Sequence, residues 1–413
     1  MSFNVALTGL NAANQDLSVT ANNLANTSTV GFKGSRTEFS DLFSSTQAGV
    51  SATAVGNGVA VQEVAQQFTQ GNIETTGNNL DLAISGNGFF TLSNNGGLEY
   101  TRDGEFQVNA NGDVVTASGA NLQVYPPLAT GGYNTGGLTD LSLNSGESAP
   151  SATTTASITA NLPANATVPT DYAADGLVPT DANTYNNTTS LTVYDSLGAA
   201  HTASLYFTKT ATNTWEASLY VDGNQVGQQE LDYSASGALT NPADGNVTFP
   251  AYTAADGLAT GANDMNMTFN FSNVTQYGNN FGVTAVNQNG FTTGLLTGIS
   301  IDGTGVVQAQ YTNGNSVNLG QVALANFANP QGLQQLGDNN WAATNSSGQA
   351  VQGVSGGSGF GTISSGSLEE SNVDTTTALV DMITAQRAFQ ANAQSIQTED
   401  QITQTVIQMA QAG

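Results

Sequence analysis

Apolar residues recur with helical spacing at both ends of the chain. Near the start, steps of three and four residues connect Phe3, Leu7, Leu10, Leu17, Ala21 and Leu24, with Asn14 in one position of the stripe. Near the end, the same spacing connects Leu379, Met382, Phe389, Ala393, Ile396, Thr403, Ile407 and Ala410. The pattern predicts an amphipathic helix over residues 1–24 and a longer one over 375–409, which a capping box of Ser371 and Asp374 would start.

Between these ends the pattern is that of β structure. Short runs alternate apolar and polar residues and are separated by turn pairs such as Asp103-Gly104, Asp222-Gly223 and Asn313-Gly314. This pattern predicts antiparallel pairing. Strands expected at 191–194, 202–207 and 215–221 follow one another closely, which indicates a self-contained β domain inserted in the chain.

The predicted fold is mainly β with terminal α-helices. The N- and C-terminal helices form a coiled-coil-like inner domain, followed by a β core domain and an inserted outer domain that is a β-barrel or a sandwich. The predicted bounds are 1–30 and 371–413 for the inner domain, 31–70 for a connecting strut, 71–145 and 289–370 for the β core, and 146–288 for the outer domain. An Ala-, Thr-, Asn- and Pro-rich stretch places the start of the outer domain only within 144–190.

Charge and composition exclude several classes of protein. The 413 residues include 31 acidic and 5 basic ones, and the cations Lys33, Arg36, Arg102, Lys209 and Arg387 form no basic stripe for nucleic acid or an anionic membrane. With no Cys and one His, the usual ligands of zinc, haem and iron–sulfur clusters are missing, so no cofactor or metal is expected. No apolar run reaches the ~18 residues of a membrane span, and the start lacks signal-peptide features. We therefore expect neither membrane insertion nor a cleavable signal peptide.

The predicted terminal helices carry few charges opposite their apolar stripes. Residues 1–24 contain one charged residue, Asp16, and glutamines run down the second helix from Gln386 to Gln408. Such a surface packs against copies of itself without leaving charges desolvated, although a helical hairpin docked on its own core is the alternative. The residues expected in an assembly interface are Leu7, Leu10, Leu17, Leu24, Leu379, Met382, Phe389 and Ile396.

The sequence offers little support for catalysis. A G-x-S-x-G pattern centred on Ser355 lacks the strand, helix and downstream histidine of a nucleophile elbow, and His201 lies far upstream. The adjacent carboxylates Glu369 and Glu370 would diverge rather than form an acid–base pair, and compensation of a helix dipole explains them better. We expect that the protein is not an enzyme.

Two terminal signatures resemble those of the bacterial flagellar rod, hook and hook-associated axial proteins. The N-terminal signature comprises Asn22, Asn23, Leu24, Ala25, Asn26, Gly31, Phe32 and Lys33, and the C-terminal one lies within 368–401, including 382–390. Residues 78–92, 100–125 and 320–348 resemble the axial core that this family shares. The middle third, including 193–198 and Trp215, looks like the outer β domain of the hook members, since rod members are much shorter.

The resemblance implies a structural subunit that self-assembles into a curved, flexible helical tube between rod and filament and transmits torque as a universal joint. The implied partners are further copies of the chain, the distal rod protein, the hook-cap protein, the hook–filament junction protein and the flagellar type III export apparatus. The implied location is the hook, outside the cell. A distal rod protein is the alternative within the family. An extracellular adhesin or surface-layer protein is the alternative outside it, but it would not explain heptads at both termini.

Overall fold

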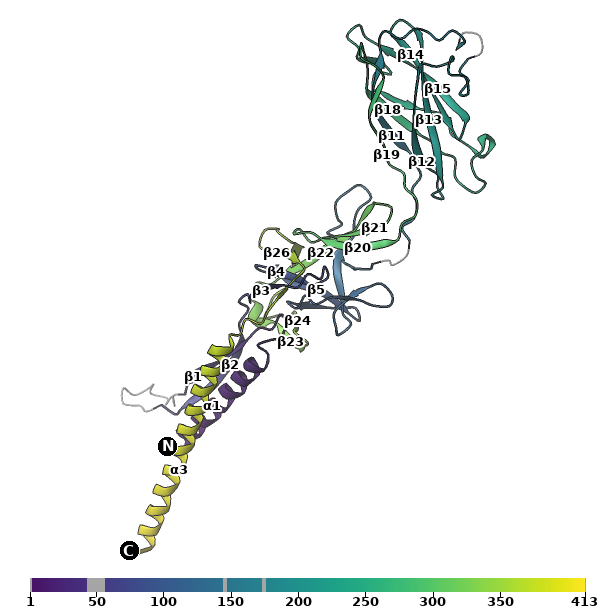
Figure 1. Ribbon diagram of the computed structural model, residues 1–413. Helices are drawn as coiled ribbons and strands as arrows, with labels where there is room; N and C mark the ends of the chain where they lie inside the picture. Colours follow the sequence, from purple (N-terminus) through teal and green to yellow (C-terminus); the bar gives the residue numbers. More distant parts are fainter. Residues whose placement is uncertain (1, 43–55, 144–146, 173–175, 413) are drawn as a thin grey trace. The chain divides into compact units, whose positions relative to one another are not determined.

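The computed structural model describes residues 2–42, 56–143, 147–172 and 176–412 (Figure 1). The chain divides into two compact units. Unit 1 comprises Met1–Asn144, Gly298–Ala309 and Ser316–Gly413, and unit 2 comprises Ser145–Thr297 and Gln310–Asn315. Residues 43–55 of the predicted strut and residues 144–146 at the predicted start of the outer domain lie outside the described residues.

One part of unit 1 consists of two helices and a hairpin. Helix α1 spans Ser2–Ala25 and α3 spans Thr375–Ala412, while strand β1 (Ser35–Asp41) pairs antiparallel with β2 (Val59–Gln66). Helix α1 packs against α3 and against both strands (Figure 1). The prediction of terminal helices is confirmed. Within the described residues, no helix combines the length and apolarity needed to cross a membrane.

The start of α3 differs from the predicted capping box. Asp374 precedes the first helical residue, and its Oδ1 accepts a hydrogen bond of 2.7 Å from the amide of Thr377. Asp374 is therefore the N-cap residue itself. The hydroxyl of Ser371 instead accepts from the amide of Val373, outside the helix, so the prediction of a capping box between Ser371 and Asp374 is wrong.

The rest of unit 1 is β structure. The strands that lie wholly or partly in it are β3 (Ile73–Thr75), β4 (Leu82–Ser85), β5 (Phe89–Asn94), β6 (Gly97–Thr101), β7 (Gln107–Val108), β8 (Val114–Val115), β9 (Asn121–Tyr125), β10 (Thr139–Asp140), β20 (Leu296–Ile301), β21 (Val306–Tyr311), β22 (Ser316–Asn326), β23 (Gln334–Gly337), β24 (Asn340–Ala342), β25 (Val351–Val354), β26 (Thr362–Ser365) and β27 (Ser367–Glu369). The 3₁₀ turn η2 (Pro330–Gly332) interrupts this series. The main sheet has the order β20-β21-β22-β9-β5-β6-β24-β23, while β26 pairs with β4 and β27 with β3.

Two apolar clusters form the core of unit 1. Leu82, Phe90 and Leu122 belong to the larger cluster and are fully buried. The smaller cluster is aromatic, with Trp341 at its centre packing edge-on against Phe68 and Phe89 at centroid distances of 5.6 and 5.8 Å. The Trp341 indole also donates a hydrogen bond of 2.7 Å to a side-chain oxygen at the end of β2, which joins the hairpin to the β core.

Unit 2 is a two-layer β sandwich. Its strands are β11 (Thr155–Pro163), β12 (Asn187–Tyr194), β13 (Ala200–Ala211), β14 (Thr214–Val221), β15 (Asn224–Tyr233), β16 (Leu239–Asn241), β17 (Asn246–Thr248), β18 (Thr268–Tyr277) and β19 (Gly282–Gln288), with the short 3₁₀ turn η1 (Ala254–Asp256). One sheet has the order β17-β18-β11-β19 and the other β12-β13-β14-β15-β16. Apolar residues of both sheets, including Trp215 and Phe271, share one core. Neither sheet closes on itself among the described strands, so the barrel alternative is wrong.

Strand pairing in unit 2 is antiparallel among the described strands, with one exception. The β14–β15 hairpin turns at Asp222 and Gly223, whose φ angles of 51° and 87° suit the predicted turn. Strands β11 and β18, however, pair in parallel. Parallel neighbours need a long crossover connection, and here β12 to β17 lie between the two strands in sequence. The prediction of wholly antiparallel pairing is therefore wrong at this pair.

Candidate assembly interface

Small side chains form the contact between α1 and α3. Positions seven residues apart are buried on both helices: Ala6, Ala13 and Thr20 on α1, and Ala378 and Ala385 on α3. Gly9 shares the stripe of α1, and a Cβ atom added to it would lie 2.8 Å from Oδ1 of Asn392 on α3. The absence of a side chain at Gly9 therefore leaves space for the Asn392 amide against the backbone of α1. We call this contact the small-residue seam.

The apolar residues expected in the assembly interface lie beside the small-residue seam. Leu7 and Leu379 are 39% and 41% exposed. The remaining six are half-buried: Leu10, Leu17, Leu24, Met382, Phe389 and Ile396. The contact stripe is thus displaced by one residue from the predicted one, with Ala6 in place of Leu7 and Ala378 in place of Leu379. The large side chains consequently keep exposed surface on the flanks of the helix pair.

The C-terminal part of α3 has an apolar surface without a partner among the described residues. At about 1.5 Å per residue, the 38 residues of α3 extend roughly 57 Å and the 24 of α1 roughly 36 Å. Figure 1 shows α3 continuing beyond α1. Ile402, Val406 and Met409 line a groove on this extension and are 53%, 53% and 63% exposed. Exposed apolar groups gathered in this way are typical of an interaction surface.

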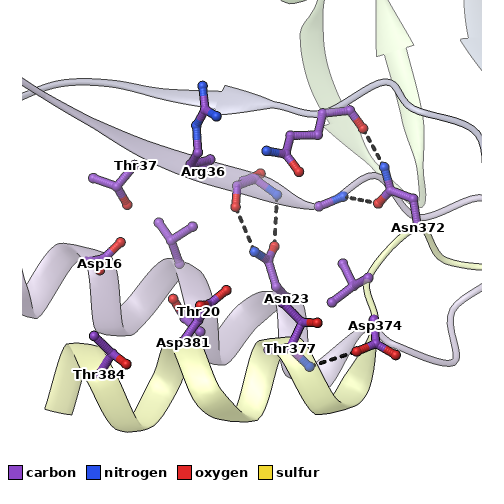
Figure 2. Close-up of a pocket in the computed structure, with 16 residues that line it drawn as sticks. Asp16, Thr20, Asn23, Arg36, Thr37, Asn372, Asp374, Thr377, Asp381 and Thr384 are labelled. Atoms are coloured by element: carbon purple, nitrogen blue, oxygen red, sulfur yellow. Dashed lines mark hydrogen bonds between the residues drawn. The ribbon is translucent and has the colours of Figure 1, made fainter.

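Two asparagine side chains hold the β1–β2 hairpin to the helices (Figure 2). Asn23 of α1 donates to the carbonyl of Ser35 at 2.7 Å and accepts from the amide of Ser35 at 2.9 Å. Asn372, before α3, accepts from the amide of Gly34 at 2.8 Å and donates to the carbonyl of Gln67 at 2.6 Å. Each amide side chain therefore takes the place of a neighbouring strand, and the hairpin is fixed to both helix ends.

A buried ion triad joins the segment after α1, the segment before α3 and the β core. Glu369, the last residue of β27, is fully buried, and Lys33 and Arg102 are 1% and 6% exposed. Nζ of Lys33 lies 2.6 Å from Oε1 of Glu369, and Nη1 of Arg102 lies 3.0 Å from Oε2. The amide of Gly71 also donates to Oε1, at 2.9 Å. We call Lys33, Arg102 and Glu369 the ion triad.

Burial and charge pairing act in opposite directions on the ion triad. Burial lowers the pKa of both Lys33 and Arg102, and the Glu369 carboxylate opposes this shift. Each cation has a further acceptor: the carbonyl of Thr69 for Lys33 at 2.9 Å, and the carbonyl of Gly86 for Arg102 at 2.7 Å. Two of the five cations of the chain thus depend on one carboxylate.

The position of Glu369 corrects the sequence interpretation of the Glu369–Glu370 pair. Helix α3 begins at Thr375, so Glu369 does not lie at its first turn, and its carboxylate is engaged in the ion triad. Glu370 is exposed. Glu369 therefore holds segments together that are far apart in sequence, and compensation of the helix dipole does not explain it.

The residues of the N-terminal signature lie where α1 passes into β1. The first five, Asn22, Asn23, Leu24, Ala25 and Asn26, form the end of α1 and the turn after it, and the last three, Gly31, Phe32 and Lys33, are buried. Gly31 has a φ of +67°, and a Cβ atom there would lie 2.5 Å from the amide nitrogen of Asp103. Its own amide donates to the carbonyl of Glu369 at 2.7 Å. Only glycine fits this position, next to the ion triad.

Asp103, beside Gly31, gives a test of electrostatics in unit 1. The pKa of its carboxyl is raised to about 6, mainly by burial. A hydrogen bond from the Glu105 amide lowers this pKa, and the carboxylates of Glu105 and Asp81 raise it. A carboxyl whose pKa is higher in the folded than in the unfolded chain destabilises the fold when it is ionised. This cost is fully present above the folded pKa and absent below the unfolded pKa of 3.8.

We therefore expect Asp103→Asn, which keeps an oxygen acceptor for the Glu105 amide, to stabilise unit 1. The free energy of unfolding should rise by about 1–2 kcal/mol near pH 7.5, and this gain should decline as the pH falls from about 6.5 to about 4. Urea unfolding of the monomer at several pH values measures the difference. A gain that does not change with pH would contradict the explanation.

The residues considered for catalysis make structural contacts. Ser355 is 5% exposed, and its hydroxyl donates to the carbonyl of Gly303 at 2.7 Å and accepts from the amide of Ile363 at 2.9 Å. His201 lies in β13, where Nδ1 is 2.6 Å from a carboxylate oxygen of Asp222 and Nε2 is 3.6 Å from one of Asp195. The serine oxygen is thus occupied, and both imidazole nitrogens face carboxylates instead of a nucleophile.

Four family models match successive parts of the chain. They are described as "Flagella basal body rod protein" (residues 3–33), "Flagellar hook protein FlgE/F/G D1 domain" (83–184), "Flagellar basal body protein FlaE D2 domain" (161–291) and "Flagellar basal body rod FlgEFG protein C-terminal" (364–409). The first and last of these matches include most of α1 and of α3. All four describe proteins of the flagellum.

Full-length relatives and a solved structure agree with these matches. The chain is 39% identical to the flagellar hook protein FlgE of Escherichia coli (strain K12) and 38% identical to that of Salmonella typhimurium, over 99% of this chain and 100% of each relative. The crystal structure of the Helicobacter pylori flagellar hook protein FlgE2 has a similar fold, with a TM-score of 0.50 and 13% identity, over 70% of this chain and 98% of that one.

Proposed function

The chain belongs to the flagellar hook protein family and is a structural subunit of the hook, and from this premise we propose which of its parts hold the hook together and which let it bend. Helices α1 and α3 provide the cohesive contacts at small radius, and unit 2 provides weak contacts that slide at large radius. The polymer is then a curved, flexible helical tube that transmits torque from rod to filament as a universal joint.

The distribution of exposed apolar side chains carries this proposal. Ten large hydrophobic residues of α1 and α3 are exposed: Phe3, Val5, Leu7, Leu379, Val380, Ile383, Ile402, Val406, Ile407 and Met409. Unit 2 has more residues than the two helices together, but the exposed large hydrophobic residues among its described residues are only Val168, Leu197, Tyr277 and Leu295. Because burial of apolar surface is the main attraction between subunits, the two helices provide far more of it per residue.

The surface of unit 2 is suited to sliding for a second reason. Lys209 is the one Lys or Arg in this unit, and it is buried, with its ammonium group donating to the carbonyl of Ala164. Unit 2 thus has no exposed Lys or Arg among its described residues to form fixed ion pairs with a neighbour. Contacts without large apolar patches or ion pairs cost little to break and re-form.

The domain assignment of the sequence analysis fits this division of roles. Residues 1–30 and 371–413 form the inner domain, 31–70 the compliant strut, 71–145 and 289–370 the β core, and 146–288 the outer domain. The two helices of the inner domain associate in a coiled-coil-like manner. Leu17 and Ile396 are half-buried beside the small-residue seam, and their remaining exposed surface contacts neighbouring copies. The ion triad supports this role because it joins the segments that flank the helices to the β core. Asn23 and Asn372 support it because they hold the hairpin to the helix ends.

The proposal includes partners at the ends of the tube and a route of export. Besides further copies of the chain, the hook subunit meets the distal rod protein, the hook-cap protein and the hook–filament junction protein. It leaves the cell through the flagellar type III apparatus without a cleavable signal peptide, and it works outside the cell without an enzymatic activity. Membership of the hook protein family supports these points.

The alternatives of the sequence analysis are not favoured. A distal rod protein or an extracellular adhesin would not be expected to match hook proteins over 99% of the chain.

Removal of the outer domain tests the proposal. Residues 148–294 would be replaced by a short Gly-Ser linker, which is feasible because the amide of Ser148 donates to the carbonyl of Gly294 at 2.8 Å. The shortened chain should still polymerise, at a critical concentration within about tenfold of the parent, but into straighter tubes. Electron microscopy of both polymers measures length and curvature.

Two outcomes would contradict the proposal. Loss of polymer, with unit 1 still folded by its tryptophan fluorescence, would show that unit 2 supplies essential cohesion. Unchanged curvature would show that contacts at small radius set the bend.

A further inference from the structure

An acidic cavity of about 430 Å³ lies between α1, α3 and β1 (Figure 2). Asp16 lines it from α1, Asp381 from α3, and Asp374 at the start of α3. Hydrogen bonds from the backbone amide and side chain of Thr377 lower the pKa of Asp374 and keep it ionised. Arg36 is also at the rim, but Figure 2 shows its side chain pointing away from the helices.

The guanidinium of Arg36 does not neutralise this cavity. It lies 2.7 Å from the Glu38 carboxylate, and the Arg36 side chain is 66% exposed. Asp16 and Asp381 make no ion pair or side-chain hydrogen bond with any residue that the structure describes. The cavity therefore has an excess of negative charge.

A second feature indicates a missing ligand. Thr37 lies next to Arg36 in β1 and lines the same cavity, and it is only 7% exposed. Its hydroxyl oxygen has no hydrogen-bond partner among the described residues. A buried hydroxyl without a partner is costly, and an N–H donor placed in the cavity would satisfy it.

The chain contains one cation that suits this cavity. Lys33 and Arg102 belong to the ion triad, Arg36 pairs with Glu38, and Lys209 donates to a backbone carbonyl beside Trp215. Arg387 on α3 is exposed and has no ion pair or hydrogen bond to any described residue. Its planar guanidinium has five N–H donors, enough for two carboxylates and a hydroxyl.

We propose that Arg387 of one copy of the chain inserts into the acidic cavity of a neighbouring copy, where it contacts Asp16 and Asp381 and donates to the hydroxyl of Thr37. A water molecule's share of liquid volume is about 30 Å³, so 430 Å³ is ample for a guanidinium group. Within one chain, Arg387 is six residues beyond Asp381, about 9 Å along the helix axis, and it does not line the cavity.

The contact rests on the proposed function, since it needs copies that meet through α1 and α3. It is heterologous, because a protruding side chain of one copy meets a cavity of the next. Contacts of this kind build open helical polymers rather than closed dimers. With a net charge of -26 per chain, copies repel one another, and a specific cation between them offsets part of this repulsion and fixes their register.

Charge reversal in separate chains tests the contact. Arg387→Glu and Asp381→Arg change exposed side chains, so both monomers should fold normally. Each variant alone should polymerise with a critical concentration raised by about tenfold or more. An equimolar mixture should polymerise at a critical concentration within about threefold of that of the parent. When the two variants alternate, every second contact joins the two substituted positions, 387 and 381, whose charges are both reversed. The contacts between them join the parental Arg387 and Asp381.

Matched controls separate the possible outcomes. Asp400→Arg places the same charge on α3 outside the cavity, and its mixture with Arg387→Glu should not recover. Recovery in a chain with both reversals but not in the mixture would show an ion pair within one chain and overturn the proposal. The proposal would also be overturned if polymerisation recovered neither in the mixture nor in the chain with both reversals. It would be overturned as well if the single variants polymerised like the parent. The proposed function is judged separately, by whether the parent polymerises and whether Val406→Asp, in the C-terminal extension of α3, prevents polymerisation.

Discussion

Replacement of Glu369 with alanine is expected to lower the free energy of unfolding of unit 1 by about 3–5 kcal/mol. The change leaves Lys33 and Arg102 buried without their shared carboxylate. Glu369 is 0% exposed and its two partners are nearly so, so bulk solvent does not reach the two cations to offset the loss of the carboxylate. The ion triad also joins the segments that flank α1 and α3, so its loss should loosen both helix ends.

The two tryptophans of the chain make the measurement specific. Trp341 is buried in unit 1 and Trp215 in unit 2, so in a Trp215→Phe background the fluorescence change on urea unfolding reports unit 1 alone. Glu370→Ala is the matched control, because the adjacent Glu370 side chain is exposed, and it should change stability by less than about 0.5 kcal/mol. If Glu369→Ala had as small an effect, the ion triad would not be what holds these segments together.

Val406→Asp is expected to abolish polymerisation while leaving the monomer unchanged. Val406 is 53% exposed in the C-terminal extension of α3, so an aspartate there meets only water in the monomer. In a polymer that buries this surface, each subunit would bury an unpaired carboxylate at a cost of several kcal/mol. Because the same cost recurs at every subunit, no tube should form at concentrations where the parent is fully polymerised.

Val406→Leu keeps the position apolar and serves as the control. It should polymerise within about threefold of the parent concentration, and both variants should show the thermal unfolding of the parent monomer. Sedimentation and electron microscopy measure the polymer. Tubes of normal length from Val406→Asp would remove the C-terminal extension of α3 from the cohesive interface.

The terminal helices could be predicted from spacing, but the seam between them could not. Hydrophobic periodicity emphasises large side chains, and it selected Leu7 and Leu379. The chain instead packs its own helices through Ala6 and Ala378, one residue away. The small side chains are buried between the elements, whereas Leu7 and Leu379 keep exposed surface. Spacing alone does not distinguish the side chains that are buried within the chain from those that stay exposed, since the two sets lie one residue apart.

The ion triad could not be found from the sequence because its members are far apart in the chain. Lys33 is 336 residues from Glu369, and Arg102 is 267 residues from it. Local reasoning assigned Glu369 to the start of a helix, since an acidic pair shortly before a helical pattern is typical of that position. The scarcity of cations was the available signal, because a chain with five of them has few to leave on its surface.

The β regions show the same limit of local information. The turn at Asp222 and Gly223 was predictable because two adjacent residues determine it. The parallel pairing of β11 with β18 depends on strands more than one hundred residues apart, as Thr155 pairs with Thr268. Whether two sheets close into a barrel also depends on such pairings, and alternation of apolar residues is the same in a barrel and a sandwich.

Hydrogen exchange of the monomer and of the polymer tests the central claim most directly, because that claim is that copies cohere through α1 and α3. Residues 401–409 of α3 are exposed in the monomer, and a helical segment without packing partners opens readily. We expect their amides to exchange at least about 100-fold more slowly in the polymer, while those of β14, within the sandwich of unit 2, keep the same rate in both states. Equal exchange of residues 401–409 in monomer and polymer would contradict the account.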